Sequence, residues 1–445
     1  MPLINLETTF NALVEALMAE VKPTEAFTLT LLGEHSQFIR FNRAKVRQTG
    51  LVTDGELRLT LIQDQRTSYR ILPFTGNQQA DWSTIQTALA DLRQEVPQLP
   101  VDPYLVTPSG ESTSRESHPG CLLAPETAAA ALLPGVEGLD FTGFYAGGLS
   151  VRAYADSIGQ RHWFETETFN LDYSLFTADG KAVKGFFADS HWDDQAYVKN
   201  LQDSKTLLAK MEQPAKPVPK GQYRTYLAPA AVADLVSMFS WGGVSEASIQ
   251  RGGSALGPLH RQEKKLSPQF HLKENFKYGA TPRFNNLGEV APVDIPLIVA
   301  GQLENTLISS RTAKEYGKVS NYAGPGESLR APEVATGDLP TDKVLETLDT
   351  GLYVSNLHYL NWSDRPNGRI TGMTRYACFW VDGGEIVAPI DNLRFDESLY
   401  RFFGDRLVSL TDSQLFIPEV GTYGHRSLGG IRTPGLLAEE FTYTL

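Results

Sequence analysis

Residues 26–74 read AFTLTLLGEHSQFIRFNRAKVRQTGLVTDGELRLTLIQDQRTSYRILPF, and this stretch decides the fold class. Segments rich in β-branched and aromatic residues alternate with segments of turn-forming residues. The pattern predicts strands over 26–32, 37–50, 56–63 and 68–74, joined by turns at GEHS, VTDG and DQRT. Consecutive strands with short connections indicate an antiparallel meander.

Basic residues in the second predicted strand alternate with small and apolar ones. Arg43, Lys45 and Arg47 are interleaved with Ala44 and Val46. Because successive side chains of a strand point to opposite faces, this spacing favours a charged outer face of a sheet. A contact with a partner is the alternative.

Helices are predicted on both sides of the meander. In the first 21 residues the apolar side chains recur at helical spacing, at Phe10, Leu13, Val14, Leu17, Met18 and Val21. A second helix is predicted over 83–96, with Ser83 as its N-cap. An exposed connection is expected over 100–120, a short helix over 125–133, and strands over 148–157, 162–177 and 182–190, the last two joined by a hairpin at ADGK.

The segment MEQPAKPVPKGQY at 211–223 predicts a linker, because its spaced prolines and lysines do not suit a core strand. The expected organisation is an N-terminal α+β domain, 1–213, a linker, 214–220, and a C-terminal mostly-β domain, 221–445. Hairpin turns are predicted at RPNGR and VDGGE. Since helices do not alternate with parallel strands, a doubly wound or barrel enzyme is disfavoured. The predicted fold class is α+β, with an antiparallel sheet and helices first and a strand-rich part second.

Composition limits the classes of partner. The 445 residues are 41% hydrophobic and 21% charged, with a net charge of −12. Such an acidic chain lacks the excess of Lys and Arg that neutralises phosphates, so neither nucleic acid nor an anionic membrane is expected as a partner. Only Cys121 and Cys378 are present, which fits a reducing compartment, and the N-terminus has no signal-peptide pattern. We therefore expect a cytoplasmic protein.

No catalytic motif is evident from the residues alone. The eight histidines stand at 35, 118, 162, 191, 260, 271, 358 and 425, whereas a helical zinc site needs two histidines three or four residues apart. A site assembled from distant residues is left open. Glu165 and Glu167 share a strand face and could bind a cation or exchange protons, although a solvated face is the simpler interpretation. Cys378 alternates with Tyr376 and Trp380, which predicts a buried thiol.

Four segments carry a family resemblance by their order along the chain. They are FIRFNRAKVRQTG at 38–50, PRFNNLGEVAPVDIPLIVAGQLENTLISSRTAKEYG at 282–317, GLYVSNLHYLNWSDRPNGRITGMTRYACFWVDGGEIVAPI at 351–390 and GTYGHRSLGG at 421–430. Together they resemble the TldD/PmbA family of gyrase-modulator and microcin-maturation proteins, and more closely its PmbA (TldE) branch. The resemblance spans most of the chain.

The catalytic branch of that family carries a helical H-E-x-x-x-H motif, in which two histidines hold a metal and the glutamate activates water. A cysteine in the C-terminal glycine-rich loop completes the site. When RGGSAL at 251–256 is placed on the family segment that follows this helix, SMFSWG falls on the motif. Ser237 and Gly242 then stand at the histidine positions, Met238 at the glutamate position and Tyr423 at the cysteine position. The resemblance implies no cofactor in this chain, with zinc only in a catalytic partner.

In the family, PmbA-type chains pair with a metal-bearing TldD-type partner, and the pair acts on unfolded peptides. The resemblance therefore implies a non-catalytic subunit of a peptidase complex, and a homodimer is also open. Ser254, Tyr423, His425 and Arg426 are expected to contact the peptide.

Two alternatives remain. The first is a metallopeptidase active alone through a rearranged site that uses His260, His271 or His425. The second is a stand-alone protein-binding module on the same scaffold.

Overall fold

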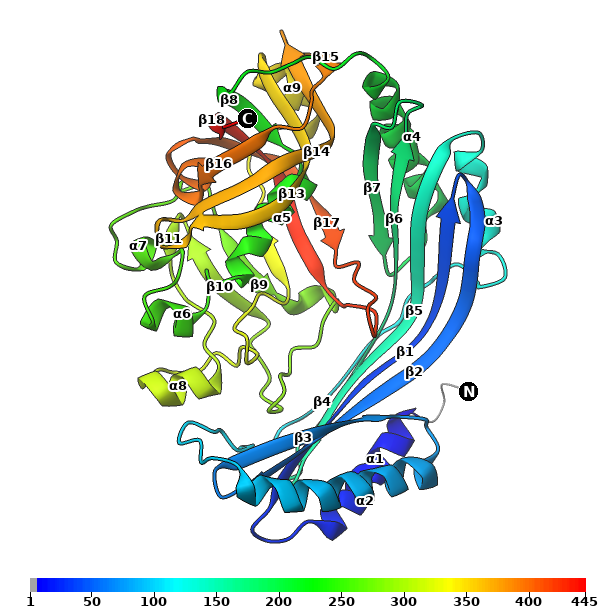
Figure 1. Ribbon diagram of the computed structural model, residues 1–445, viewed down its shortest axis with the longest axis vertical. Helices are drawn as coiled ribbons and strands as arrows, with labels where there is room; N and C mark the ends of the chain where they lie inside the picture. Colours follow the sequence, from blue (N-terminus) through cyan, green and yellow to red (C-terminus); the bar gives the residue numbers. More distant parts are fainter. Residues whose placement is uncertain (1–5) are drawn as a thin grey trace.

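The computed structural model describes residues 6–445 and contains two β-sheets with helices packed on them (Figure 1). The predicted α+β class is confirmed. The N-terminal sheet curves down the right side of Figure 1, from β6 and β7 at the upper right to β3 at the bottom, and the C-terminal sheet lies at the upper left. No helix within 6–445 combines the length and apolar character that crossing a membrane requires.

The N-terminal sheet has seven strands in the order β3-β2-β1-β5-β6-β4, with β7 also paired to β6. Its strands are β1 Ala26–Asn42, β2 Lys45–Gln63, β3 Arg66–Pro73, β4 Thr113–His118, β5 Asp140–Asp156, β6 Arg161–Phe176 and β7 Ala182–Asp189. Its helices are α1 Leu6–Glu20, α2 Gln78–Glu95, α3 Ala128–Leu132 and α4 Asp194–Met211.

Two separate cores stabilise this long sheet. Helices α1 and α2 cover one end, where Leu13, Leu17 and Ile85 are fully buried. Helices α3 and α4 cover the other end. The predicted apolar face of α1 is confirmed except at Met18, which follows the buried Leu17 around the helix and is 38% exposed. Residues 1–5 of the predicted N-terminal helix lie outside the described residues.

Two of the three predicted turns of the meander are wrong, whereas the turn at DQRT is confirmed, because β2 and β3 are joined at Asp64 and Gln65. GEHS and VTDG are not turns, because β1 and β2 run through them and pair Gly33 with Gly55. The hairpin instead turns at Arg43 and Ala44, whose φ angles are +51° and +53°. A two-residue hairpin turn of this kind needs positive φ at both positions. The extended pairing of β1 with β2 on either side stabilises it. Arg43 is thus a turn residue and not part of a strand face.

Other boundaries also differ from the prediction. Helix α2 begins at Gln78, before the predicted cap Ser83, because Asn77 is the N-cap and accepts a hydrogen bond from the Ala80 N–H at 3.1 Å. The expected connection over 100–120 contains β4, which pairs in parallel with β6. Helix α4 was not predicted, although the side chain of Asp193 caps it by accepting hydrogen bonds from the N–H groups of Gln195 and Ala196. The short helix near 125–133 and the β6–β7 hairpin are confirmed.

The C-terminal sheet has eleven strands in the order β11-β10-β9-β12-β18-β16-β14-β13-β8, with β15 on β14 and β17 on β18. Its strands are β8 Gly221–Leu227, β9 Leu272–Asn275, β10 Asp294–Val299, β11 Gln302–Leu303, β12 Pro332–Val334, β13 Gly351–Asp364, β14 Arg369–Asp382, β15 Glu385–Pro389, β16 Arg394–Ser398, β17 Leu407–Pro418 and β18 Gly430–Tyr443. Its helices are α5 Pro229–Ser237, α6 Glu246–Gln250, α7 Gly257–His260, α8 Ser310–Tyr316 and α9 Val344–Leu348. The predicted hairpins after β13 and β14 are confirmed.

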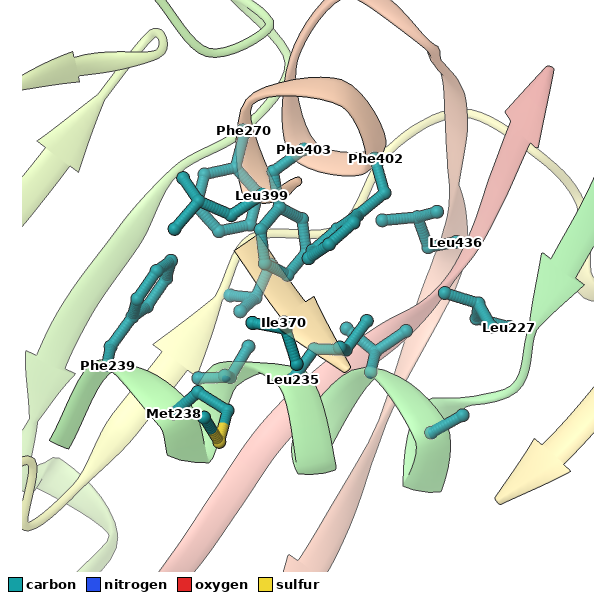
Figure 2. Close-up of a cluster of buried hydrophobic side chains, with 14 of the residues drawn as sticks. Leu227, Leu235, Met238, Phe239, Phe270, Ile370, Leu399, Phe402, Phe403 and Leu436 are labelled. Carbon is teal, nitrogen blue, oxygen red and sulfur yellow. The ribbon is translucent and has the colours of Figure 1, made fainter. Parts of the chain in front are cut away.

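Strand β8 pairs with both β13 and β18, so five strands close into a ring of pairings. Helix α5 packs against β13 and β18. Leu235 near its C-terminal end, and Met238 and Phe239 in the turn that follows, join a cluster that includes Phe270 and Phe403 (Figure 2). Burying side chains of this size contributes roughly 1.5–3 kcal/mol each. This helix is therefore a central packing element of the C-terminal sheet.

The two sheets contact each other. Ala377 and Phe379 of β14 belong to the same core as α3 and α4, and the loop between β17 and β18 reaches the middle of the N-terminal sheet (Figure 1). Helix α4 ends at Met211 and β8 begins at Gly221. The division of the chain at 214–220 stays a prediction.

Candidate functional site

The segment that the resemblance places on the metal motif, 237–242, leaves the helix after its first residue. Helix α5 starts at Pro229, whose fixed φ suits a first helical position, and ends at Ser237. One tight turn over 238–240 follows. Gly242 then has φ +83°, a left-handed conformation that favours glycine. Ser237 and Gly242 therefore do not share a helix.

The side chains at these positions point to different environments. Ser237 is exposed, and its hydroxyl donates to the Asp234 carbonyl at 2.7 Å. Met238 is only 4% exposed and lies in the apolar cluster shown in Figure 2. Neither position presents an imidazole or a carboxylate to a common point.

Arg365 occupies the space beside Gly242. A Cβ atom on Gly242 would lie 2.9 Å from Arg365 Nη1 and 3.2 Å from its Cδ. The same guanidinium lies 3.6 Å, through Nη2, from the Cβ position of Gly253. Trp362, on the strand before Arg365, donates its Nε1–H to the Trp241 carbonyl at 2.7 Å. The β13–β14 hairpin thus covers the glycine-rich turn with a positive charge.

One titratable group lies on the same helix. Asp234 accepts a hydrogen bond from the Leu357 N–H through Oδ2 at 3.1 Å. Burial raises the pKa of its carboxyl to about 7, and the hydrogen bond opposes part of that rise. Sequence reasoning missed this residue, because a single aspartate in an apolar helix gives no sign of its burial.

The polar residues of the C-terminal glycine-rich loop, 419–429, lie in different environments. Tyr423, at the cysteine position, is fully exposed, so it contacts neither Ser237 nor Gly242. Arg426 is 2% exposed and reaches into the N-terminal sheet. Its Nη2 donates to the carbonyl and hydroxyl of Thr168, both at 2.9 Å, and its Nη1 donates to the Gly148 carbonyl at 3.0 Å. Burial lowers the pKa of Arg426, and nearby Glu34 opposes that effect.

The other two expected peptide contacts lie apart from Tyr423. His425 is mostly buried, with Nδ1 3.9 Å from Glu34 Oε1 and Nε2 4.0 Å from Glu56 Oε2. Ser254 is 2% exposed, and its hydroxyl donates to the Gly243 carbonyl at 2.6 Å. Ser254 therefore holds the glycine-rich turn from inside. The structure does not bring the four residues onto one surface.

A cavity of about 320 Å³ lies between the two sheets beside this loop. Arg432 enters it with the guanidinium carbon 3.8 Å from the ring centre of Tyr278 and 4.8 Å from that of Phe416. Asn170, also in the lining, is 6% exposed and its Oδ1 has no hydrogen-bond partner. These residues come from strands far apart in sequence, so no local motif could have indicated the cavity.

The remaining candidates have structural surroundings. Cys378 is 1% exposed, as predicted, and burial raises the pKa of its thiol to about 11. Glu165 accepts hydrogen bonds from the Ser117 hydroxyl at 2.7 Å and from Trp163 Nε1 at 2.9 Å. Glu167 accepts from the Gly120 N–H at 2.9 Å. In the part of the chain that the structure describes, no three His, Cys, Asp or Glu side chains are grouped as metal ligands.

Comparisons with known proteins identify the family of this chain. The family model for the PmbA/TldA metallopeptidase C-terminal domain matches residues 220–444. The chain belongs to the TldD/PmbA family. The resemblance of the four sequence segments is thus confirmed at the level of the family.

Solved structures of TldD/PmbA-type proteins share the fold along almost the whole chain. TldE from Thermococcus kodakarensis matches with a TM-score of 0.77 and 13% identity, covering 98% of this chain and 100% of that one. A candidate DNA gyrase modulator from Bacteroides thetaiotaomicron matches with a TM-score of 0.77 and 15% identity, covering 98% of each chain. One from Thermotoga maritima matches with a TM-score of 0.75 and 14% identity, covering 98% and 100%. No curated protein matches the sequence.

Proposed function

We propose that this chain is the non-catalytic, TldE-like subunit of a two-component metallopeptidase that acts on unfolded peptides. Zinc and the hydrolytic water are held by a TldD-like partner with an intact H-E-x-x-x-H motif. The chain works in the cytoplasm and supplies part of the surface that holds the peptide. The N-terminal domain, 1–213, and the C-terminal domain, 221–445, both contribute to that surface.

The main support is the Arg365 guanidinium beside Gly242. The Nη1 atom of Arg365 lies 2.9 Å from the Cβ position of Gly242, so the guanidinium would repel a divalent cation bound here. Met238, at the glutamate position, is 4% exposed and cannot activate water. The segment 221–259 also contains no histidine. These features all oppose metal chemistry at this position.

A peptide contact is best supported at Tyr423. An exposed aromatic ring on a glycine-rich loop can stack on or slide along an extended chain with little demand on sequence. Ser254 and Arg426 are already hydrogen-bonded inside the protein, so their role in the proposal is to hold the loops that carry the contact. His425 is mostly buried beside Glu34 and Glu56, so a direct peptide contact is less well supported there than at Tyr423.

The alternatives are distinguished by their own residues. A peptidase active alone would need its metal held by His260, His271 or His425. His271 Nδ1 already accepts a hydrogen bond from the Ala300 N–H at 3.2 Å, and His425 faces Glu34 and Glu56. No observation favours this route over the proposal. A stand-alone binding module is compatible with the same surface and differs only in lacking a catalytic partner.

The test is reconstitution with a TldD-like relative that has the intact motif. The isolated chain is expected to carry less than about a tenth of an equivalent of zinc and to cleave no unfolded peptide. The mixture is expected to form a stable complex at micromolar concentration and to cleave. A complex with the motif glutamate of the partner replaced by glutamine is the control, since it should assemble without cleaving.

Two results would overturn the proposal. Near-stoichiometric zinc in the isolated chain, with hydrolysis that a chelator abolishes, would make the chain an enzyme in its own right. Failure of the two chains to associate would leave the stand-alone binding module as the better account.

A further inference from the structure

The cavity of about 320 Å³ between the two sheets gathers polar atoms that lack partners. Among the buried side-chain polar atoms of residues 6–445 that have no hydrogen-bond partner, three belong to residues that line it. They are Arg426 Nε, Asn170 Oδ1 and His118 Nε2. Buried polar groups are normally hydrogen-bonded, and an unpaired one is destabilising. Three such atoms around one cavity therefore indicate a polar ligand.

Arg432 presents the edge of its guanidinium to this cavity. In the part of the chain that the structure describes, its guanidinium packs over the rings of Tyr278 and Phe416 and forms no ion pair. Packing against rings leaves the N–H groups, which lie in the guanidinium plane, free at the edge. Two parallel N–H groups in this plane match the two oxygens of a carboxylate. Arg432 is thus already oriented to bind an anion.

Arg426 adds a second positive charge without an ion pair among the described residues. Its side chain is 2% exposed, and its Nη atoms donate to neutral groups of Gly148 and Thr168. A buried charge is normally paired with an opposite charge. An anion in the cavity would supply that charge and accept the unused Nε–H.

The rest of the lining fits a positive group on the same ligand. Asp189 at the end of β7 and Glu419 after β17 are its two carboxylates, and Asn170 offers an amide oxygen. Since Arg426 and Arg432 are its two cations, the formal charges of the lining cancel when the histidine is neutral. Separated charges of both signs are complementary to a zwitterion, whereas the carboxylates would repel the second negative charge of a phosphate.

We propose that this cavity binds a free α-amino acid in its zwitterionic form. The ligand carboxylate accepts hydrogen bonds from Arg432 and from Arg426 Nε. Its ammonium group donates to Asn170 Oδ1 and faces Asp189 and Glu419. This binding goes beyond the proposed peptidase role and needs no catalytic partner.

The size of the cavity and its apolar residues indicate which amino acids fit. Its volume lies at the low end of small-molecule sites, which span roughly 300–1,000 Å³, and so suits a single amino acid. Ala188, Pro418 and Leu428 complete the lining with apolar surface. We therefore expect leucine and phenylalanine to bind more tightly than serine or aspartate.

Calorimetric titration of the purified chain with L-leucine and L-phenylalanine tests the proposal. Binding is expected with a dissociation constant of about 1 mM or less. N-acetyl-L-phenylalanine lacks the ammonium group and L-phenylalaninamide lacks the carboxylate. Each is expected to bind at least about tenfold more weakly than phenylalanine, because one charged contact is lost.

Variants place the ligand in this cavity. Arg432→Gln and Asn170→Leu are each expected to weaken binding at least about tenfold, and Arg432→Lys should recover only part of the loss. Arg58→Gln is the matched control, because Arg58 also packs on a ring, 3.6 Å from the centre of Tyr69, but lies outside the cavity. Urea unfolding confirms that each variant is folded. Arg426 is left unchanged, since it also holds the two sheets together.

Several outcomes contradict the proposal. Absence of binding of either amino acid at about 10 mM excludes it. Unchanged affinity in folded Arg432→Gln and Asn170→Leu places the ligand elsewhere. N-acetyl-L-phenylalanine or inorganic phosphate binding as tightly as phenylalanine would make this a simple anion site. The ligand series needs no variant, so it decides the question even where a variant does not fold. Zinc content and association with a TldD-like chain are separate measurements, so failure here leaves the proposed function standing.

Discussion

Replacing Asp234 with asparagine is expected to stabilise the protein, and to do so more at high pH. The Asp234 carboxyl has a pKa of about 7 in the folded chain, against 3.8 ordinarily, because it is buried on α5. The folded state therefore holds its proton more tightly than the unfolded state does. The contribution of this one group to stability is greatest below about pH 4, falls as the pH rises toward 7, and stays low above it.

The size of the effect follows from the two pKa values. Each unit is worth 1.36 kcal/mol, so the difference between 3.8 and about 7 corresponds to at most about 4 kcal/mol above pH 7. At pH 5.5 the carboxyl is still largely protonated when folded, and about 2 kcal/mol of this remains to be lost. Asparagine carries no charge at any pH and keeps an oxygen that can accept the Leu357 N–H. The advantage of Asp234→Asn should thus grow by about 2 kcal/mol from pH 5.5 to pH 8.

Urea titrations of both chains at the two pH values measure this difference, with amide exchange of 229–237 reporting on α5 itself. Asp391→Asn is the control, because Asp391 is exposed on the same half of the chain and should give no pH-dependent gain. If the advantage of Asp234→Asn were equal at both pH values, the carboxyl would already be ionised in the folded chain. The reasoning from burial would then be refuted.

Further changes probe the loops around the motif. Arg426→Ala should weaken the contact between the sheets by about 3 kcal/mol or more, because it leaves several buried acceptors without a donor, and exchange of the β6 amides should speed up accordingly. Arg426→Lys, with one ammonium in place of a planar fork, should recover only part of this. Gly242→Ala should cost about 1–3 kcal/mol in urea unfolding through its positive φ and its clash with Arg365. The cost should be smaller in an Arg365→Ala background, and strict additivity of the two changes would contradict the contact. Tyr423→Ala should change stability by less than about 0.5 kcal/mol, since the ring is fully exposed. It should nevertheless weaken peptide binding by the reconstituted complex, and an unchanged affinity would remove Tyr423 from the peptide contact.

Local patterns in the sequence predicted which side chains of individual helices and strands are buried. The spacing of Leu13 and Leu17 predicted a buried helix face, and the alternation around Cys378 predicted a buried thiol. Two turns of the meander were wrong because GEHS and VTDG are turn-like in composition, whereas the structure pairs them with each other across β1 and β2 and pairs GEHS with β5 as well. Pairing across a sheet outweighed local turn preference there.

The site was harder to predict than the fold because its contacts are long-range. Arg426 meets Thr168 across 258 positions of sequence, and a charged residue in a glycine-rich loop is normally exposed. Nothing local indicates that Arg426 is buried. Arg365 likewise reaches Gly242 from a separate hairpin, so the sequence could predict that the motif residues are missing but not what lies in their place.

If the motif is absent as proposed, the separation between the packing residues and the motif positions along α5 and the turn that follows it explains how the family fold persists. Leu235, Val236 and Phe239 are fully buried and hold the helix in the C-terminal core. Ser237 and Gly242, which the resemblance places at the two histidine positions, are not part of that core. Met238 goes further, because an apolar side chain at the glutamate position adds to the core shown in Figure 2. A carboxylate there would have to be buried without a partner, at a cost of several kcal/mol. A methionine at this position therefore stabilises the scaffold more than a glutamate would, and Met238→Glu is expected to destabilise it.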